Sequence, residues 1–339
     1  MVATIFIDQQ YPVRKVLKYV GLSPSSYYWQ SDVANGNKRG LPASEFTKNQ
    51  HGENVSNAIV VKQIKSLLST EFVDYGYLKV THYLRDTFHY IINHKKVYRL
   101  MSVNNLLYQP TRIKVGNKQW VSKLVPEPLV AFTYWEFDIK FMYIHGTGKL
   151  IPLLTVIDVY SRWMLGYMFK SSIKKEDVKL FFEHITTVYY QPDKIYVRCD
   201  NGSQFESTLV RDYFKKLKIE QEFTKPATPE QNAHIESYHS IIDKVICRGY
   251  EFETSNDMVN VLKRWGLFYN YKRIHSSTNY KSPYVNLLQQ GIDIHEIFNL
   301  RSSLPEYIFI PLNKTETSAA EEQLVRDSLV EGNSTMRAK

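Results

Sequence analysis

The sequence predicts an α/β fold, in which a mixed five-stranded sheet with flanking helices follows an all-helical region. Apolar residues alternate or run continuously along three successive stretches between residues 133 and 170. From residue 174, helical periodicity alternates with short apolar runs, and before residue 110 apolar residues recur at helical spacing. Three strands followed by alternating helices and strands form a mixed sheet. The 339 residues, 43% of them hydrophobic, suffice for two or three folded domains.

The positive charge of the chain is concentrated in its N-terminal part. The formal net charge is +9. Residues 1–130 hold 17 Lys and Arg against 8 Asp and Glu, whereas residues 131–339 hold 26 of each. A basic region joined to a neutral remainder is typical of a nucleic-acid-binding segment attached to another domain. Charge alone leaves open that the chain is simply a basic soluble protein.

Several classes of protein do not match this sequence. The two cysteines, Cys199 and Cys247, form no CxxC pair, which argues against a structural zinc site and against a secreted disulfide framework. The N-terminus lacks the pattern of a signal peptide. No stretch approaches the run of about 18 apolar residues that a membrane span needs. We therefore expect a soluble cytosolic protein.

The first 110 residues are expected to form short helices. Residues 1–56 hold a helical pair over 11–30, with Gly21 as a C-cap, and then a linker over 31–56 that is rich in Ser, Asn, Gly and Pro. A second helical unit spans 57–110. Its three helices are predicted from the spacing of their residues. The first carries Ile59, Ile64, Leu67 and Leu68, and the second carries Leu78, Thr81, Leu84 and Arg85. The third begins after an N-cap at Asn93 and carries Val97, Leu100 and Met101.

The third of these helices has a basic face. Lys95, Lys96 and Arg99 lie opposite its apolar residues. A basic face backed by a small helical core is how helix-turn-helix modules approach DNA. An ordinary solvated face has the same pattern, and the N-terminal concentration of charge favours DNA. Residues 111–130, with scattered Lys, Arg, Pro and Gly, are predicted to be a connector.

The elements of the predicted sheet follow in order. Residues 133–145 alternate, with one face formed by Trp135, Phe137, Ile139, Phe141 and Tyr143 and the other by Asp138 and Lys140. Short loops predict an antiparallel meander with the next two strands. The remaining elements are strands at 150–158, 162–170, 194–199 and 219–223, and helices at about 174–190, 205–217, 232–248 and 255–271. This domain spans 131–295, and an extension over 296–339 is expected to be flexible from about 313.

Three acids of this domain stand at positions suited to metal binding. Asp138 lies on the polar face of a strand, Asp200 directly follows a strand, and Glu236 lies on a helix after a gap of 35 residues. Divalent cations such as Mg²⁺ prefer oxygen ligands, and two such ions about 4 Å apart support phosphodiester chemistry. Each acid taken singly also has an ordinary explanation, as an edge residue, an ion-pair partner or a solvated helix residue.

The motifs around these acids match a known family. The segments WEFDIKFMYI, CDNGSQF, PEQNAHIES and NYKRIHSSTNYKSP resemble the catalytic core of retroviral integrases and bacterial insertion-sequence transposases. Upstream, YGYLKVTHYLRDTF and HKKVYRLMSVNNL resemble the DNA-binding helices of transposases encoded by the downstream frame of frameshifting, two-frame insertion sequences. The resemblance covers nearly the whole chain except 31–56 and the tail. It implies a ribonuclease-H-like core behind a helix-turn-helix-like region.

The resemblance also implies an activity. Asp138, Asp200 and Glu236 would be the catalytic triad of a DNA transposase, holding two Mg²⁺ or Mn²⁺ ions. Water would release a 3′-hydroxyl at the end of the element, and this hydroxyl would then attack target DNA and so integrate the element. The expected partners are the terminal inverted repeats, target DNA, further copies of the chain and the upstream-frame product, with no membrane. This places the protein in the cytoplasm, at the nucleoid.

Further DNA contacts follow from the resemblance. Lys244 and Arg273 are expected to bind DNA, in addition to the basic face over 95–99. Lys225, before the segment PATP, is expected to grip DNA ends from a mobile loop, and a rigid Pro turn is the alternative. The family usually carries Lys or Arg seven residues after the Glu, whereas this chain has Asp243 there. Lys244 follows at about 80° from Glu236 around a regular helix, so it reaches a phosphate less directly.

Two further residues, Asp158 and His239, are expected to have roles outside the triad. A structural hydrogen bond or ion pair is favoured for Asp158 over metal binding, and His239 is expected to support the site or contact DNA. The chain is expected to be the downstream part of a longer fused transposase. A nuclease of the same fold and a catalytically silent DNA-binding remnant are the alternative functions.

Overall fold

The structure, a computed structural model, describes residues 2–28, 43–108, 128–189, 194–225, 229–298, 300 and 303–312. The chain divides into two compact units, Met1–Glu45 and Phe46–Lys339. Residues 111–127 of the predicted connector and the tail from 313 lie outside the described residues. Among the helices that the structure describes, none has the length and hydrophobicity of a transmembrane segment.

The first unit is a small helical assembly. It contains α1 (Val2–Asp8), α2 (Val13–Tyr19) and α3 (Pro24–Tyr27) around the buried side chains of Ala3, Val16 and Leu17. The predicted pair corresponds to α2 and α3, and α1 is additional. Gly21 adopts a φ of +67°, and the Leu22 N–H donates to the Leu17 carbonyl at 2.9 Å. This conformation ends α2, as predicted for a glycine C-cap.

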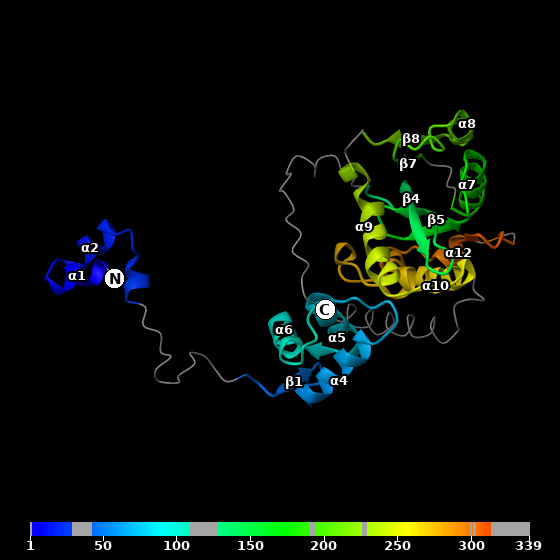
Figure 1. The fold of residues 1–339 in the computed structure, drawn as a ribbon. Coiled ribbons are helices and arrows are strands. Elements are labelled where there is room, and N and C mark those ends of the chain that lie inside the picture. Colours follow the sequence, from blue (N-terminus) through cyan, green and yellow to red (C-terminus); the bar gives the residue numbers. More distant parts are fainter. Residues whose placement is uncertain are drawn as a thin grey trace. The chain divides into compact units, whose positions relative to one another are not determined.

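The region that follows combines helices with a small sheet (Figure 1). Its helices are α4 (Asn57–Leu68), α5 (Tyr77–Phe88) and α6 (His94–Val103). Antiparallel strands β1 (Phe46–Asn49), β2 (Asn54–Ser56) and β3 (Tyr90–Ile91) lie in the order β2-β1-β3. The prediction of an all-helical region is therefore wrong here, and part of the predicted linker is a hairpin. These strands are two to four residues long and mostly polar, so they lack the apolar alternation that reveals longer strands.

The three predicted helices of this region are confirmed, with two shifts in their buried faces. Val97, Leu100 and Met101 are buried on α6, and the Asn93 side chain accepts from the Lys95 N–H at 2.9 Å as the predicted N-cap. On α4 and α5, however, the predicted core residues Ile59 and Leu78 are exposed. Each helix is rotated slightly from the expected face, so that the neighbouring valines, Val60 and Val80, enter the core instead.

A six-stranded mixed sheet forms the second part of this unit. Its strand order is β8-β7-β4-β5-β6-β9. β4, β7 and β8 run parallel, and the other neighbours pair antiparallel. The strands are β4 (Tyr134–Ile144), β5 (Lys149–Asp158), β6 (Met164–Phe169), β7 (Ile195–Cys199), β8 (Ile219–Phe223) and β9 (Ile308–Phe309).

The five predicted strands and their antiparallel meander are confirmed, and β9 is a correction. It comes from the segment predicted to be only an extension, and it adds a sixth strand. Phe309 pairs with Tyr167 and Ile308 with Met168 of β6. Two residues are too few to produce a periodic pattern, so only the sheet edge that they meet reveals them as a strand.

Helices cover both faces of this sheet (Figure 1). One face packs against α7 and α8, and the other against α9 and α10. Because both faces are covered, β6 is buried throughout and β5 nearly so, which explains their continuous apolar sequences. The helices are α7 (Lys175–Tyr189), α8 (Thr208–Lys216), α9 (Ala233–Ile242), α10 (Ser255–Leu267), α11 (Pro283–Gln289) and α12 (Ile294–Ile297), with π-helical turns after α9 and α10 at Asp243–Cys247 and Phe268–Lys272.

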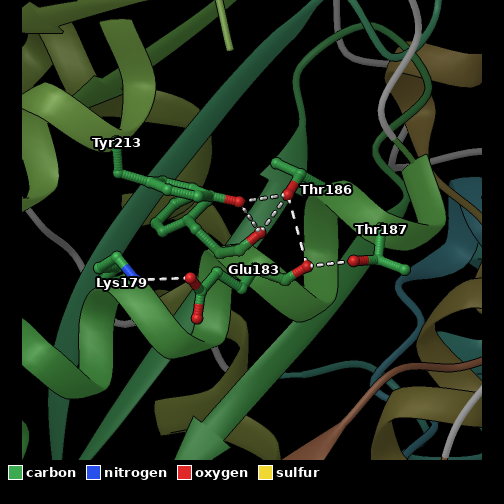
Figure 2. A network of polar contacts seen from close by, with 6 residues as sticks. Lys179, Glu183, Thr186, Thr187 and Tyr213 are labelled. Carbon is green, nitrogen blue, oxygen red and sulfur yellow. Dashed lines mark hydrogen bonds and ion pairs between the residues drawn. The ribbon is translucent and has the colours of Figure 1, made fainter. Parts of the chain in front are cut away.

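Polar contacts hold α8 against α7 (Figure 2). The hydroxyls of Thr186 on α7 and Tyr213 on α8 lie 2.7 Å apart, and Thr186 also donates to the Phe182 carbonyl at 2.6 Å. One turn away, Lys179 donates to Glu183 at 2.5 Å. These contacts satisfy polar groups within a largely apolar interface. The contact between Thr186 and Tyr213 therefore ties α8 to α7 on this side of the sheet.

The alternation of β4 is only partly as predicted. Trp135 and Phe137 are fully buried on the face covered by α7 and α8. Phe141 and Tyr143 continue that face but are exposed, by 60% and 48%. Instead, the opposite face is buried there, through residues such as Met142 that pack towards α9 and α10. The cover by α7 and α8 therefore ends part-way along β4, whereas the opposite face stays covered by α9 and α10, which the sequence of β4 does not reveal.

The sixth strand gives a prediction about stability. Phe309 is buried against α10 and β6, so Phe309→Ala should lower the free energy of unfolding by about 3–5 kcal/mol. The matched control, Ile297→Ala on α12, removes a side chain that is 52% exposed and should change stability by less than about 0.5 kcal/mol. Urea unfolding followed by circular dichroism measures both. Equal, small effects of the two substitutions would show that β9 is not part of the folded sheet.

Candidate active site

Asp138 lies on β4, and Asp200 directly follows the neighbouring parallel strand β7. The register pairs Glu136 of β4 with Arg198 of β7, and each aspartate follows two residues later in the same direction. Residues two apart on a strand share a face of the sheet. The two carboxylates therefore point to one face although 61 positions separate them in the sequence.

The electrostatics of this pair favour a cation. Burial and then the negative charge of Asp138 raise the pKa of Asp200, and the hydrogen bond from the Gly202 N–H, at 3.1 Å, opposes that rise. Two carboxylates held together in this way repel each other unless a proton or a metal ion lies between them. Oxygen donors are the ligands that Mg²⁺ and Mn²⁺ prefer, so the pair is suited to a divalent metal ion.

Glu236 and His239 lie on α9, which covers this face. His239 is buried, and its Nδ1 is 3.4 Å from Asp138 Oδ2; a role in supporting the site stays a prediction. Glu236 lies in the first turn of α9 and is exposed. Within the part of the chain that the structure describes, no three His, Cys, Asp or Glu side chains form a group that could hold a metal. The fold thus brings the two aspartates to one face of the sheet, and the three predicted acids do not form a metal-binding group among the described residues.

Glu136, the acid two residues before Asp138, was not among the residues predicted for the site. Its side chain is fully buried, and Oε2 accepts hydrogen bonds from the backbone N–H groups of His234 at 3.0 Å and Ile235 at 2.9 Å. Burial raises the pKa of Glu136 to about 7, against the lowering effect of these bonds. Its spacing of two from Asp138 placed it on the same face and was the available signal.

Asp158 has the structural role favoured for it. It is fully buried at the end of β5, where Oδ1 accepts from the Phe132 N–H at 2.8 Å and Oδ2 from the Ser161 N–H at 2.7 Å. Burial raises the pKa of Asp158 to about 6, and the bonds from Ser161 and Phe132 oppose this. The carboxylate thereby fixes the turn between β5 and β6.

The helix that carries Glu236 widens into a π-helical turn at Asp243. Asp243 Oδ1 pairs with Lys140 Nζ of β4 at 2.7 Å. Lys244 Nζ pairs with Asp74 Oδ2 at 2.9 Å and lies over the Tyr108 ring, 4.5 Å from its centre. Because the backbone departs from regular α-helical periodicity here, the angle expected between Glu236 and Lys244 does not apply.

Arg273 requires a correction. Its side chain is only 3% exposed, and Nη1 pairs with Asp74 Oδ1 at 2.6 Å. Burial opposes ionisation of Asp74, but Arg273 and then Lys244 lower its pKa to about 2. A guanidinium enclosed in this way cannot bind DNA, so the expectation for Arg273 is wrong: it joins the α4–α6 region to the sheet domain.

Comparison with known proteins adds to this geometry. An integrase core domain family matches residues 130–229, a second integrase core domain family matches 217–283, and an HTH-like domain family matches 56–114. The transposase for insertion sequence element IS904 of Lactococcus lactis is 26% identical over 242 residues, which cover 68% of this chain and 94% of the relative. The chain is an insertion-sequence transposase homologue with an integrase core domain.

Other similarities are weaker or less extensive. An uncharacterized 39.2 kDa protein of insertion element IS476 from Xanthomonas euvesicatoria is 27% identical over 209 residues, covering 60% of this chain and 57% of that protein. Among solved structures, a chain of the simian T-cell lymphotropic virus intasome in complex with PP2A regulatory subunit B56 gamma aligns with a TM-score of 0.42 and 12% identity. That alignment covers 73% of this chain and 78% of the viral one.

The remaining basic residues of this transposase homologue differ in accessibility. Lys95 and Arg99 are exposed on α6, within the HTH-like domain. Lys96 is partly buried, and its Nζ donates to the Phe46 carbonyl at 2.5 Å. Lys225 is exposed, while its backbone N–H donates to Gln231 Oε1 at 2.6 Å. DNA binding by Lys95, Arg99 and Lys225 stays a prediction that their exposure permits.

Proposed function

We propose that this chain is a DNA transposase that cleaves at the ends of an insertion sequence and joins them to target DNA. The observation that carries this proposal is the pair of carboxylates Asp138, on β4, and Asp200, directly after the adjacent parallel strand β7 of an integrase core domain, with α9, the helix that carries Glu236, packed over the same face. The HTH-like domain ahead of this core supports DNA as the substrate.

The proposed active site consists of Asp138, Asp200 and Glu236, which together would hold two Mg²⁺ or Mn²⁺ ions. Such ions supply charge neutralisation at the attacking and leaving oxygens of the phosphodiester. The chain itself orients the ligands. His239 lies against Asp138, the Gly202 N–H holds one oxygen of Asp200, and α9 carries Glu236 over the sheet.

The proposed partners are the terminal inverted repeats of the element and target DNA. Lys95 and Arg99, on the exposed face of α6, would contact phosphates, so binding should weaken as salt is raised. Assembly of several copies on DNA, cooperation with the product of an upstream frame, and a place at the nucleoid in the cytoplasm belong to the same proposal.

A joining assay tests the function. The protein is incubated with a labelled duplex carrying one end of its insertion sequence, with plasmid target and Mg²⁺ or Mn²⁺. We expect labelled end covalently joined to the plasmid. Cleavage of an RNA–DNA hybrid in place of joining would instead indicate a ribonuclease H of the same fold. Binding of the end without cleavage would indicate a silent remnant.

A further inference from the structure

We propose that Glu136 is a positioning residue, which fixes the start of α9 on β4 and so sets where Glu236 stands relative to Asp138 and Asp200. This inference rests on the proposed function for its catalytic consequence. The structural part of the inference concerns one buried carboxylate and the helix above it. This part can be tested even if the protein shows no joining activity.

The hydrogen bonds of Glu136 reach the first turn of α9. The N–H groups of His234 and Ile235 both donate to Oε2, at 3.0 and 2.9 Å. The first N–H groups of a helix have no partner within the helix, and the helix dipole favours a negative charge beside them. Glu236 is the next residue, so the turn that Glu136 holds is the turn that carries the third proposed ligand.

Neighbouring residues of β4 continue this attachment. The Phe137 carbonyl accepts from Asn232 Nδ2 at 3.4 Å, just before α9. Asp138 lies 3.4 Å from His239, one turn after Glu236. Three consecutive strand residues thus contact this segment: Phe137 just before α9, Glu136 in its first turn and Asp138 after that turn. Of these three contacts, those of Glu136 are the shortest, and they alone are made to backbone N–H groups of α9.

Glu136 acts through the helix and does not face the reacting groups. It is fully buried beneath α9, and one oxygen is occupied by two backbone amides. The other, Oε1, is also buried and has no hydrogen-bond partner among the described residues. A buried carboxylate is tolerated only when its interactions compensate for lost hydration, and here the amides of α9 supply them.

The test compares Glu136→Ala and Glu136→Gln with a matched control. Asp158→Ala also removes a fully buried carboxylate that accepts two backbone N–H groups, but those groups lie away from α9. Hydrogen exchange of residues 233–242 is measured in the metal-free protein. Joining rate and the Kd for end DNA are measured separately with Mg²⁺.

Glu136→Ala should speed exchange at the start of α9 by about tenfold or more, as expected for loss of hydrogen bonds to a charged group. It should slow joining by a similar factor while the Kd for end DNA stays within about twofold. Glu136→Gln keeps an acceptor oxygen of the same reach and should retain joining within about threefold. In Asp158→Ala, exchange at α9 should match the wild-type rate once the rates are corrected for the change in global stability of that variant.

Unchanged exchange at α9 in Glu136→Ala, or an equal acceleration in Asp158→Ala, would overturn the inference. Should the alanine variant not fold, Glu136→Asp, which withdraws the carboxylate by one methylene, takes its place. If the wild-type protein joins no DNA, the proposed function fails, and the exchange experiment still decides whether Glu136 positions α9.

Discussion

Asp200→Asn is expected to lower the rate of strand transfer by about 10³-fold or more, and Asp138→Asn and Glu236→Gln to have effects of the same order. Each change keeps the size of the side chain and removes the negative charge that a divalent ion requires. The measurement is the amount of labelled element end joined to plasmid over time, at saturating Mg²⁺ and again with Mn²⁺.

A metal-free measurement separates this catalytic role from a structural one. The negative charge of Asp138 disfavours ionisation of Asp200, so the neutral amide removes a repulsion. Without metal, the Asp200→Asn variant should therefore have a melting temperature equal to or above that of the wild-type protein. Asp212→Asn, an exposed change on α8, is the control and should join at the wild-type rate. Normal joining by Asp200→Asn would exclude this residue from the site, and a lowered melting temperature would indicate a structural role.

Arg273→Leu is expected to destabilise the second unit by about 3–5 kcal/mol. The substitution leaves the carboxylate of Asp74, only 11% exposed, without its closest cation. Lys244→Ala removes the other cation beside the same carboxylate, but that lysine is 44% exposed and its loss should cost less than about 1 kcal/mol. Urea unfolding of both variants, followed by fluorescence, gives the two free energies.

A double-mutant cycle tests whether Asp74 and Arg273 act as a pair. Asp74→Asn removes the charge that Arg273 balances, so the double variant with Arg273→Leu should be less destabilised than the two single effects predict together. Simple additivity would show that the two side chains contribute separately. Loss of the pair should also separate the unfolding of the α4–α6 region from that of the sheet domain, which appears as two transitions.

The sheet domain was largely predictable because its signals are local. β5 is a continuous apolar run since both of its faces are covered, and the acids at Asp138 and Asp200 stand out because they interrupt or end apolar strands. The N-cap at Asn93 and the end of α2 at Gly21 were also readable, since a cap depends on residues a few positions away.

Other features carried no local signal. β9 is recognisable only beside β6, and the strands around Phe46–Ser56 are too short and polar to show alternation. The exposed half of β4 depends on where its covering helices end. Arg273 was expected at DNA because a basic residue in a motif gives no indication of whether its charge faces solvent or a buried acid.

The sequence by itself determined the class of fold and the order of the main strands and helices, because periodicity expresses these within a few residues. The three acids proposed for catalysis followed from the resemblance of the motifs around them to a known family. Only the tertiary structure decided which groups meet. Asp74 pairs with Arg273 across 199 positions, and Glu136 holds Ile235 across 99. Such contacts arise when distant segments exclude water from the same charged groups, and nothing in either segment alone specifies the other.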